Sequence, residues 1–198
     1  MNPSVLIATA THEVKEYSLR RWIDAYQNMA YEPRDVLLVD NSATLELSER
    51  WKTETNIMHI QVDGTPHERI GKSMEMIRRY ALGRNFDYWL SIECDVIVPA
   101  NTIEIMLDWR GLEKADFYSM PCPARNNTFL FQNNFCCALF SRELMQKIPF
   151  ENLPSIQAID GWFIRKLLDA GMALAGEPPV QLTLEHLSHP DASKDIWW

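Results

Sequence analysis

The sequence has no apolar run that approaches the roughly 18 residues needed for a membrane-spanning helix, so we expect no membrane span. It also has no excess of basic residues, because 27 Asp and Glu outnumber 19 Lys and Arg and the formal net charge is −8. General nucleic-acid binders usually carry a basic surface, and this class is therefore disfavoured. No basic stretch precedes the first apolar run, which argues against a signal peptide.

The cysteines also show no CxxC spacing; they are Cys94, Cys122, Cys136 and Cys137. Their neighbours are apolar, strand-like residues or proline, which favours buried free thiols in a reducing, cytoplasmic environment. Zinc binding by Cys122, Cys136 and Cys137 together with the C-terminal histidines is disfavoured, because the spacing fits no usual zinc pattern.

The length of 198 residues and the 46% apolar content predict one domain with a sizeable core. Its first 95 residues alternate between strand and helix patterns. We expect strands over Ser4–Thr9, Asp35–Asp40, Ile57–Val62 and Tyr88–Glu93, with helices over residues 14–29, 45–53 and 70–81 between them. The continuous apolar run after Asp35 is typical of parallel strands covered on both faces. This half predicts an α/β, Rossmann-like domain with a mostly parallel central sheet flanked by helices.

The second half is less regular. We expect helices over Asn101–Arg110, Arg142–Ile148 and Asp160–Ala170, and strands over Asp116–Met120, Phe135–Ser141 and Val180–His186. Two loops are also expected, one flanked by Pro66 and Gly71 and a long one over Pro121–Asn134.

The strand over Tyr88–Glu93 runs into two acids, Glu93 and Asp95. Alternate side chains of a strand point to the same side, so the two carboxylates can converge at its end. Ligands of open α/β sheets bind outside the carboxyl ends of the strands, so the loops after Thr9, Asp40 and Glu93 are expected to face one crevice. Two carboxylates there suit a divalent cation that holds phosphates, although acids at this position can also merely cap a turn.

Several segments occur in an order that is informative as a set. They are Val5–Thr11, Asp35–Ser42, Glu93–Asp95, Cys137–Leu144 and Asp160–Phe163, followed by His186. In this order the chain resembles the GT-A type of nucleotide-sugar glycosyltransferases, most closely the inverting family-two group. The segments correspond to that family's first strand, its second strand and turn, its DxD metal motif, its strand-to-helix step beside the acceptor site, and its catalytic acid.

The resemblance extends over nearly the whole chain and implies a single GT-A-like domain. Residues 1–95 would form its nucleotide-binding half and residues 96–198 its acceptor-side half. The sequence departs from the family in having Glu93 as the first acid of the DxD motif and Ile159 before Asp160, where the family usually has Glu-Asp. The long acceptor-binding part that follows in many members has no counterpart here.

The resemblance also implies roles for single residues. Asp160 would be the catalytic base, Asp95 a direct ligand of Mn²⁺ or Mg²⁺, and Glu93 a support for the ribose or for the metal through water. Asp40 would contact the nucleoside. His186, and less readily His189, would be a further metal ligand.

Other candidates follow from the residues themselves. Arg69 and Lys72, at the start of a helix, would suit a diphosphate. Thr9 and Thr11 could contact the base, and Trp162 could stack on the sugar or acceptor. Plain structural roles stay open for several of these positions: helix N-caps for Thr11 and Asp160, an Asx turn for Asp40, a core position for Trp162, a solvated surface for the two cations and ordinary hydrogen bonding for the histidines.

The leading hypothesis is a metal-dependent glycosyltransferase that uses a nucleoside-diphosphate sugar, with UDP the commonest nucleotide in the resembled family. A nucleotidyltransferase usually needs a glycine-rich loop after the first strand, and Ala8–His12 has no glycine. A non-catalytic nucleotide-sugar binding module would tolerate loss of Asp160. Retaining rather than inverting chemistry also stays open.

The acceptor is not identified and could be a sugar, a lipid-linked group, a protein or a nucleobase. Arg125 and its aromatic neighbours in the loop Pro121–Asn134 could line its site. Trp197-Trp198 could dock on the body, cover the site or mediate a homodimer. A bacterial or viral enzyme of the host cytosol fits these features better than a Golgi enzyme.

Overall fold

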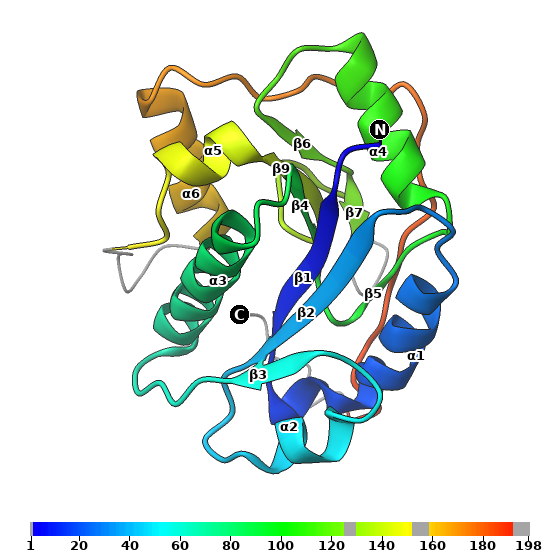
Figure 1. Cartoon of the computed structure of the whole chain (residues 1–198). Coiled ribbons are helices and arrows are strands. Elements are labelled where there is room, and N and C mark those ends of the chain that lie inside the picture. The colour runs from blue at the N-terminus through cyan, green and yellow to red at the C-terminus, as the bar shows by residue number, and fades with distance from the viewer. Residues whose placement is uncertain (1, 125–129, 152–158, 192–198) are drawn as a thin grey trace.

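A six-stranded sheet forms the centre of the computed structural model, which describes residues 2–124, 130–151 and 159–191. The strand order is β3-β2-β1-β4-β9-β6 (Figure 1). The strands are β1 (Val5–Thr11), β2 (Arg34–Asp40), β3 (Ile57–His59), β4 (Tyr88–Ile92), β6 (Phe117–Ser119) and β9 (Cys137–Ser141). The pairings among β3, β2, β1 and β4 are parallel, and β9 is antiparallel to β4 and β6. The expected single α/β domain with a mostly parallel sheet is confirmed.

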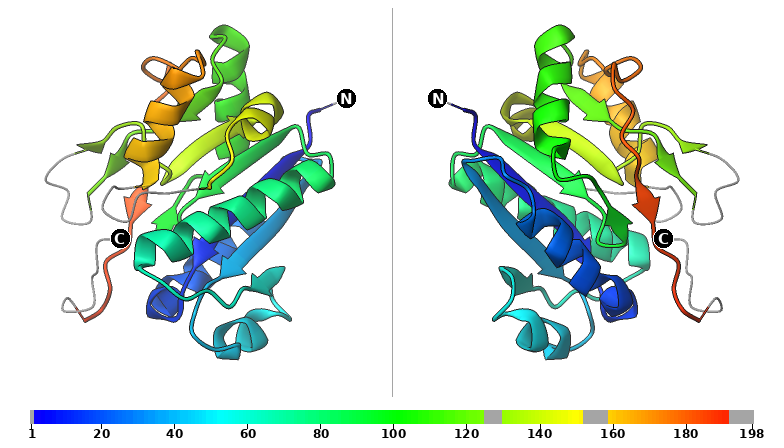
Figure 2. Two further views of the ribbon diagram at one scale, coloured as in Figure 1. Left: turned by 90° about the vertical axis from the view of Figure 1, so that its left-hand side faces the viewer. Right: turned by 90° about the vertical axis from the view of Figure 1, so that its right-hand side faces the viewer.

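Helices cover both faces of this sheet (Figures 1 and 2). One face carries α1 (Glu16–Gln27) and α4 (Thr102–Leu112), and the other carries α3 (Pro66–Gly83), α5 (Arg142–Lys147) and α6 (Ile159–Asp169). A short 3-10 helix η1 (Glu13–Lys15) precedes α1, and α2 (Glu46–Trp51) contacts β3. Side chains of β1 alternate between the two cores, with Val5 and Ile7 in one and Leu6 and Ala8 in the other. Such two-sided burial explains why the strands are almost continuously apolar.

Two small antiparallel pairs lie beside the main sheet. β5 (Val96–Ile97) pairs with β10 (Glu185–His186), and β7 (Cys122–Pro123) pairs with β8 (Leu130–Phe131). The strand expected over Val180–His186 is wrong for all but its last two residues. Val180 is 51% exposed, so the apolar alternation there does not mark a buried strand face. β10 nevertheless places His186 opposite Val96 of β5, the strand that directly follows Glu93 and Asp95.

The start of α3 also differs from the expectation. Pro66 and Gly71 do not flank a loop, because α3 begins at Pro66 and contains Gly71. Thr65 is its N-cap and forms a capping box with Glu68, and proline suits the first helical position. Thr11 is not a helix cap either, since it ends β1 and His12 caps η1.

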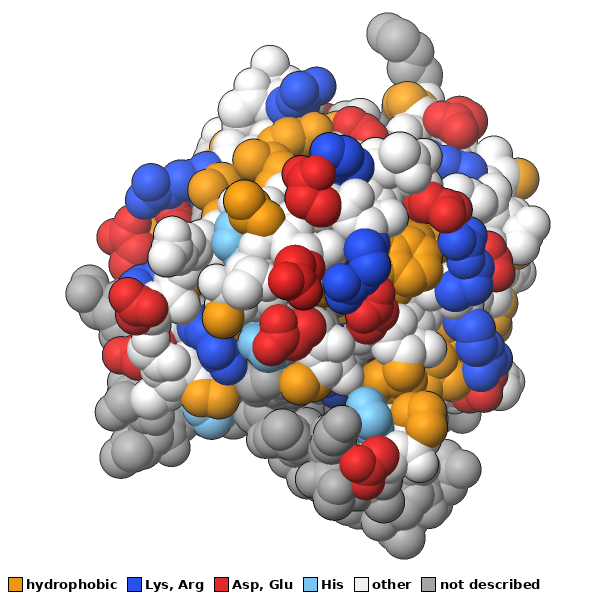
Figure 3. Space-filling model, turned by 90° about the horizontal axis from the view of Figure 1, so that it is seen from below, with side chains coloured by type: hydrophobic (Ala, Val, Ile, Leu, Met, Phe, Trp, Pro, Cys, Tyr) orange, Lys and Arg blue, Asp and Glu red, His pale blue; other side chains and the backbone are white. Residues whose placement is uncertain are grey.

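Parallel strands end at a common edge, which lies at the bottom of Figure 1. Figure 3 looks onto this edge, where acidic, basic and histidine side chains are interspersed with apolar ones. The four cysteines are free and buried, as expected. Within the described residues, no helix combines the length and the apolar character needed to cross a membrane.

Candidate active site

A cavity of about 250 Å³ opens at the carboxyl edge of the sheet. Its walls come from the ends of β1 and β4, the beginnings of α3 and α6, the segment before β9, and β10. The lining residues are Thr9, Ala10, Thr11, His12, Lys15, Asn41, His67, Ile70, Met74, Ser91, Glu93, Cys94, Asp95, Asn134, Phe135, Cys136, Ile159, Asp160 and His186. The segments after β1, β2 and β4 therefore face one crevice, as expected.

Glu93, Asp95 and His186 converge in this cavity. One ligand atom from each lies within 4.8 Å of the others. Glu93 and Asp95 follow β4, and His186 arrives from near the other end of the chain because β10 pairs with β5. The acid pair and His186 are thus brought together as expected, although the strand that carries His186 is much shorter.

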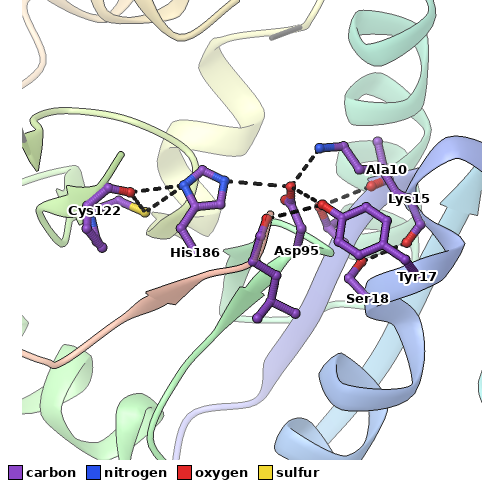
Figure 4. A network of polar contacts seen from close by, with 10 residues as sticks. Ala10, Lys15, Tyr17, Ser18, Asp95, Cys122 and His186 are labelled. Atoms are coloured by element: carbon purple, nitrogen blue, oxygen red, sulfur yellow. Dashed lines mark hydrogen bonds and ion pairs between the residues drawn. The ribbon is translucent and has the colours of Figure 1, made fainter. Parts of the chain in front are cut away.

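Asp95 is the centre of a buried polar network (Figure 4). Its Oδ2 atom accepts a hydrogen bond from Lys15 Nζ at 2.6 Å and one from the Tyr17 hydroxyl at 3.3 Å. Nε2 of His186 lies 3.6 Å from the same oxygen. The Lys15 and Asp95 side chains are only 8% and 2% exposed, so this is an interior ion pair.

The environment shifts the titration of both flanking groups. Burial and the charge of Asp95 raise the pKa of Glu93 to about 7, against the smaller opposing effects of His186 and Lys15. Burial disfavours the charged form of His186, but its interactions with Asp95 and Cys122 and the charges of the carboxylates outweigh burial and raise its pKa to about 10. Asp95 therefore faces a protonated His186 and the Lys15 side chain, while Glu93 holds its proton more strongly than an exposed glutamate does.

Two carboxylates and an imidazole match the ligands that Mn²⁺ takes, and Mg²⁺ accepts the oxygen part of this set. Nε2 of His186 is buried and has no hydrogen-bond partner within the described residues. The residues present therefore fit such a cation, with Lys15 as a competing positive charge on Asp95. His189 is outside this group: its ring packs edge-to-face on Tyr17, and its Nδ1 atom accepts from the backbone N–H of Asp191.

Sulfur lies on the opposite side of His186. Sγ of Cys122 is 4.0 Å from His186 Nδ1, and Cys136 completes a group whose ligand atoms lie within 4.8 Å of one another. Nδ1 is also 3.0 Å from the carbonyl oxygen of Pro123. Hydrogen bonding from Cys136, followed by that from His186, outweighs burial and lowers the pKa of Cys122 to about 6. The sequence disfavoured zinc binding here because the spacing of these residues fits no usual zinc pattern.

Asp160 lines the cavity from the first turn of α6. Burial raises the pKa of its carboxyl group, partly offset by backbone N–H groups of Asp160 and Gly161. Trp162 points elsewhere: it is 6% exposed and packs near Phe150 in one of the two cores. Trp162 therefore occupies a core position, which is the structural role that the sequence left open for it.

Of the residues expected to contact the nucleoside, some line the cavity and one does not. Thr9 and Thr11 line the cavity. Asp40 is fully buried at the end of β2, where its carboxylate accepts from the Ser42 N–H at 2.9 Å in an Asx turn. Its neighbour Asn41 lines the cavity instead.

The two cations of α3 lie outside the cavity lining. Lys72 is exposed and lines a separate hollow with Glu75 and Arg79. Arg69 is half-buried, and its charge helps to lower the pKa of His12, after the larger effect of burial. His67 and Ile70 are the residues of this helix start that face the cavity.

Sequence reasoning missed Lys15, Tyr17 and Asn134. Lys15 is 80 residues from Asp95, and no local pattern links the two. The one available signal for Lys15 was its position shortly after β1, at the edge of the sheet where ligands bind. Arg125, Phe129 and Trp197-Trp198, which were considered for the acceptor site or for a covering role, lie outside the described residues.

No protein-family model matches this sequence, and no protein of curated function matches it. Solved structures do match it. With S. aureus TarS 1–349 the TM-score is 0.61 at 13% identity, over 91% of this chain and 59% of that chain. With the TarS complex of UDP-GlcNAc the TM-score is 0.59 at 15% identity, over 92% and 57%. With the TarS complex of UDP it is 0.60 at 14% identity, over 95% and 61%.

The chain thus spans about three fifths of the length of these TarS structures. Identities of 13–15% show a shared fold and no more. That fold is the one of the glycosyltransferase TarS, which agrees with the α/β architecture expected from the sequence. The finer assignment to the family-two group and the division into two halves stay predictions.

Proposed function

We propose that the protein is a glycosyltransferase that moves a sugar from a nucleoside-diphosphate sugar, with UDP as the nucleotide, to an acceptor. The observation that carries the proposal is the convergence of Glu93, Asp95, His186 and Asp160 on one cavity at the carboxyl edge of the sheet. The shared fold with TarS, whose structures include complexes with UDP-GlcNAc and UDP, supports the choice of donor. The order of the sequence motifs favours the inverting family-two type, and the four buried free cysteines favour a reducing, cytosolic environment.

The donor diphosphate would lie beside the acid pair. Glu93, Asp95 and His186 would hold Mn²⁺ or Mg²⁺, which when bound neutralises charge that develops on the leaving diphosphate. Lys15 lines the same cavity, and its ammonium would attract the anionic donor. Thr9, Thr11 and Asn41 line the side nearer β2, where they would contact the nucleoside.

Asp160 would act as the general base. Its carboxylate takes the proton of the acceptor nucleophile while the nucleophile forms a bond to the anomeric carbon of the sugar. The bond from that carbon to the diphosphate oxygen breaks, and its electron pair leaves with the diphosphate. Because burial raises the pKa of Asp160, its carboxylate is a stronger base than an exposed aspartate.

Donor binding is tested first, by the melting temperature with UDP, GDP, CDP and dTDP sugars in Mn²⁺ and then in excess EDTA. A ligand that binds only the folded state raises the melting temperature. We expect a rise with UDP-sugars that disappears in EDTA. No rise with any donor would contradict the proposal.

Catalysis is tested with Asp160→Asn, with Asp169→Asn as the matched control at the exposed end of the same helix. We expect Asp160→Asn to keep the donor-induced rise and to lose at least about 100-fold in release of UDP, the lower range of a general-base contribution. Asp169→Asn should match the wild type in both measurements. Full UDP release by Asp160→Asn would show that this carboxylate is not the base.

A further inference from the structure

We infer that Cys122, Cys136 and His186 form a second metal site, one for a thiophilic divalent ion such as Zn²⁺. The site shares His186 with the oxygen-rich cluster of the proposed transferase activity, so an ion on its sulfur side leaves the donor-side cation to Glu93 and Asp95. It does not depend on that activity. It uses Nδ1 of His186, which faces Cys122, whereas Nε2 on the other side of the ring faces Asp95 (Figure 4).

The geometry is close to that of a bound zinc ion. Zn–S bonds of about 2.3 Å and Zn–N bonds of about 2.0–2.1 Å at tetrahedral angles place neighbouring ligand atoms roughly 3.5–3.8 Å apart. Cys122 Sγ and His186 Nδ1 are 4.0 Å apart, and the whole group lies within 4.8 Å. Inward shifts of a few tenths of an ångström to about 1 Å would complete these three bonds.

The ligands come from three segments that the fold holds in place. Cys122 lies on β7, Cys136 precedes β9, and His186 lies on β10. Both cysteines are almost fully buried, at 0% and 4% exposure, so the backbone around them is fixed by packing. The backbone N–H of Cys136 donates to the Asn134 side chain at 2.8 Å, which further holds that segment.

The choice of metal follows from the donor atoms. Two thiolates and one imidazole select Zn²⁺ and other soft or borderline ions over Mg²⁺ and Mn²⁺. Metal binding at Nδ1 replaces its 3.0 Å contact with the Pro123 carbonyl oxygen. The imidazole then carries its proton on Nε2, which faces Asp95 Oδ2 at 3.6 Å. A carboxylate that accepts from the outer nitrogen of a metal-bound histidine is the usual arrangement at zinc sites. Three protein ligands leave a fourth position for water or another small ligand.

Binding of Co²⁺ to the reduced, metal-stripped full chain tests the site without any nucleotide. Tetrahedral Co²⁺ with thiolate ligands gives a charge-transfer absorption in the near ultraviolet that oxygen and nitrogen ligands do not give. We expect this band to saturate at one Co²⁺ per chain, to vanish on addition of Zn²⁺, and to persist in a large excess of Mg²⁺. A reduced wild-type protein without the band would overturn the inference.

Cysteine variants locate the ligands. Cys122→Ala and Cys136→Ala should each weaken Co²⁺ binding by at least about tenfold and reduce the charge-transfer band. Cys137→Ala is the matched control, because Cys137 is equally buried but does not belong to the group of ligand atoms that Cys122, Cys136 and His186 form. An unchanged band in both test variants, or an equal loss in Cys137→Ala, would also overturn the inference.

A second measurement needs no variant and covers the case in which these substitutions prevent folding. X-ray absorption of the zinc-loaded wild type should show two sulfur scatterers at about 2.3 Å together with nitrogen or oxygen. A shell of oxygen and nitrogen alone would place the ion on the Glu93 and Asp95 side and reject the sulfur site. Because no sugar donor is present, failure of this site and failure of the transferase proposal are distinguishable.

Discussion

Lys15 and Asp95 face each other in the interior at 2.6 Å. Removing one partner of a buried ion pair leaves the other charge without compensation, at a typical cost of about 3–5 kcal/mol. We therefore expect Lys15→Met to lower the free energy of unfolding by about this amount in EDTA. Saturating Mn²⁺ should raise the free energy of unfolding of the variant by more than that of the wild type. The reason is that Lys15 and the cation compete for Asp95.

Urea unfolding measures both effects. The matched control is Lys52→Met, since Lys52 is exposed and pairs with Glu49 on the surface. Exposed pairs contribute up to about 1 kcal/mol, so this control should change little. Equal losses in the two variants would mean that Lys15 does not balance the acid cluster.

The same cluster makes stability depend on pH in a defined direction. His186 has a pKa raised to about 10 from an ordinary 6.5, so its contribution is complete below pH 6.5 and is lost as pH rises toward 10. Glu93 has a pKa raised to about 7 from 4.5, so burying its charged form costs stability as pH rises from 4.5 to 7. Both groups make the metal-free protein less stable as pH rises.

Urea unfolding at a series of pH values in EDTA measures this trend. Relative to the wild type, His186→Asn should flatten the decline above pH 6.5, and Glu93→Gln should flatten it below pH 7. Each proton retained by the folded state alone contributes a slope of about −1.4 kcal/mol per pH unit. Identical pH profiles for the wild type and both variants would contradict the charge arrangement of the cluster.

At the scale of elements, the sequence predicted the helices and strands that local patterns of apolar and capping residues determine. The buried parallel strands β1, β2 and β4 are visible as apolar runs, and the acid pair is visible as a break at the end of one of them. The start of α3 was readable too, since Thr65 and Glu68 have the spacing of a capping box with Pro66 between them. The strand assigned to Val180–His186 failed because alternation alone does not supply a neighbouring strand to pair with.

Contacts between distant segments had no such signal. Cys122 and His186 are 64 residues apart, and only the pairing of β10 with β5 brings His186 between the sulfur atoms and Asp95. The contact of Asp40 with the nucleoside stays a prediction. Its carboxylate forms the Asx turn with Ser42 that the sequence left open as a local alternative.

At the scale of the molecule, the sheet runs without interruption across the boundary at residue 95 that separates the two expected halves. β4 pairs with β9 over five residue positions, from Tyr88 opposite Ser141 to Ile92 opposite Cys137. An aromatic cluster crosses the same boundary, because Trp89 stacks on Phe140 at 4.4 Å and Phe140 contacts Phe117 and Phe163. The two halves therefore share one core on this face.

This shared core predicts one cooperative unfolding transition. Phe140→Ala should lower the free energy of unfolding by about 3–5 kcal/mol, the usual cost of removing a buried phenylalanine, while tryptophan fluorescence and far-ultraviolet circular dichroism still change together. Phe86→Ala, at a half-buried position beside the same core, should cost clearly less. Two separated transitions, with Phe140→Ala shifting just one of them, would mean that residues 1–95 and 96–198 fold as independent units despite the continuous sheet.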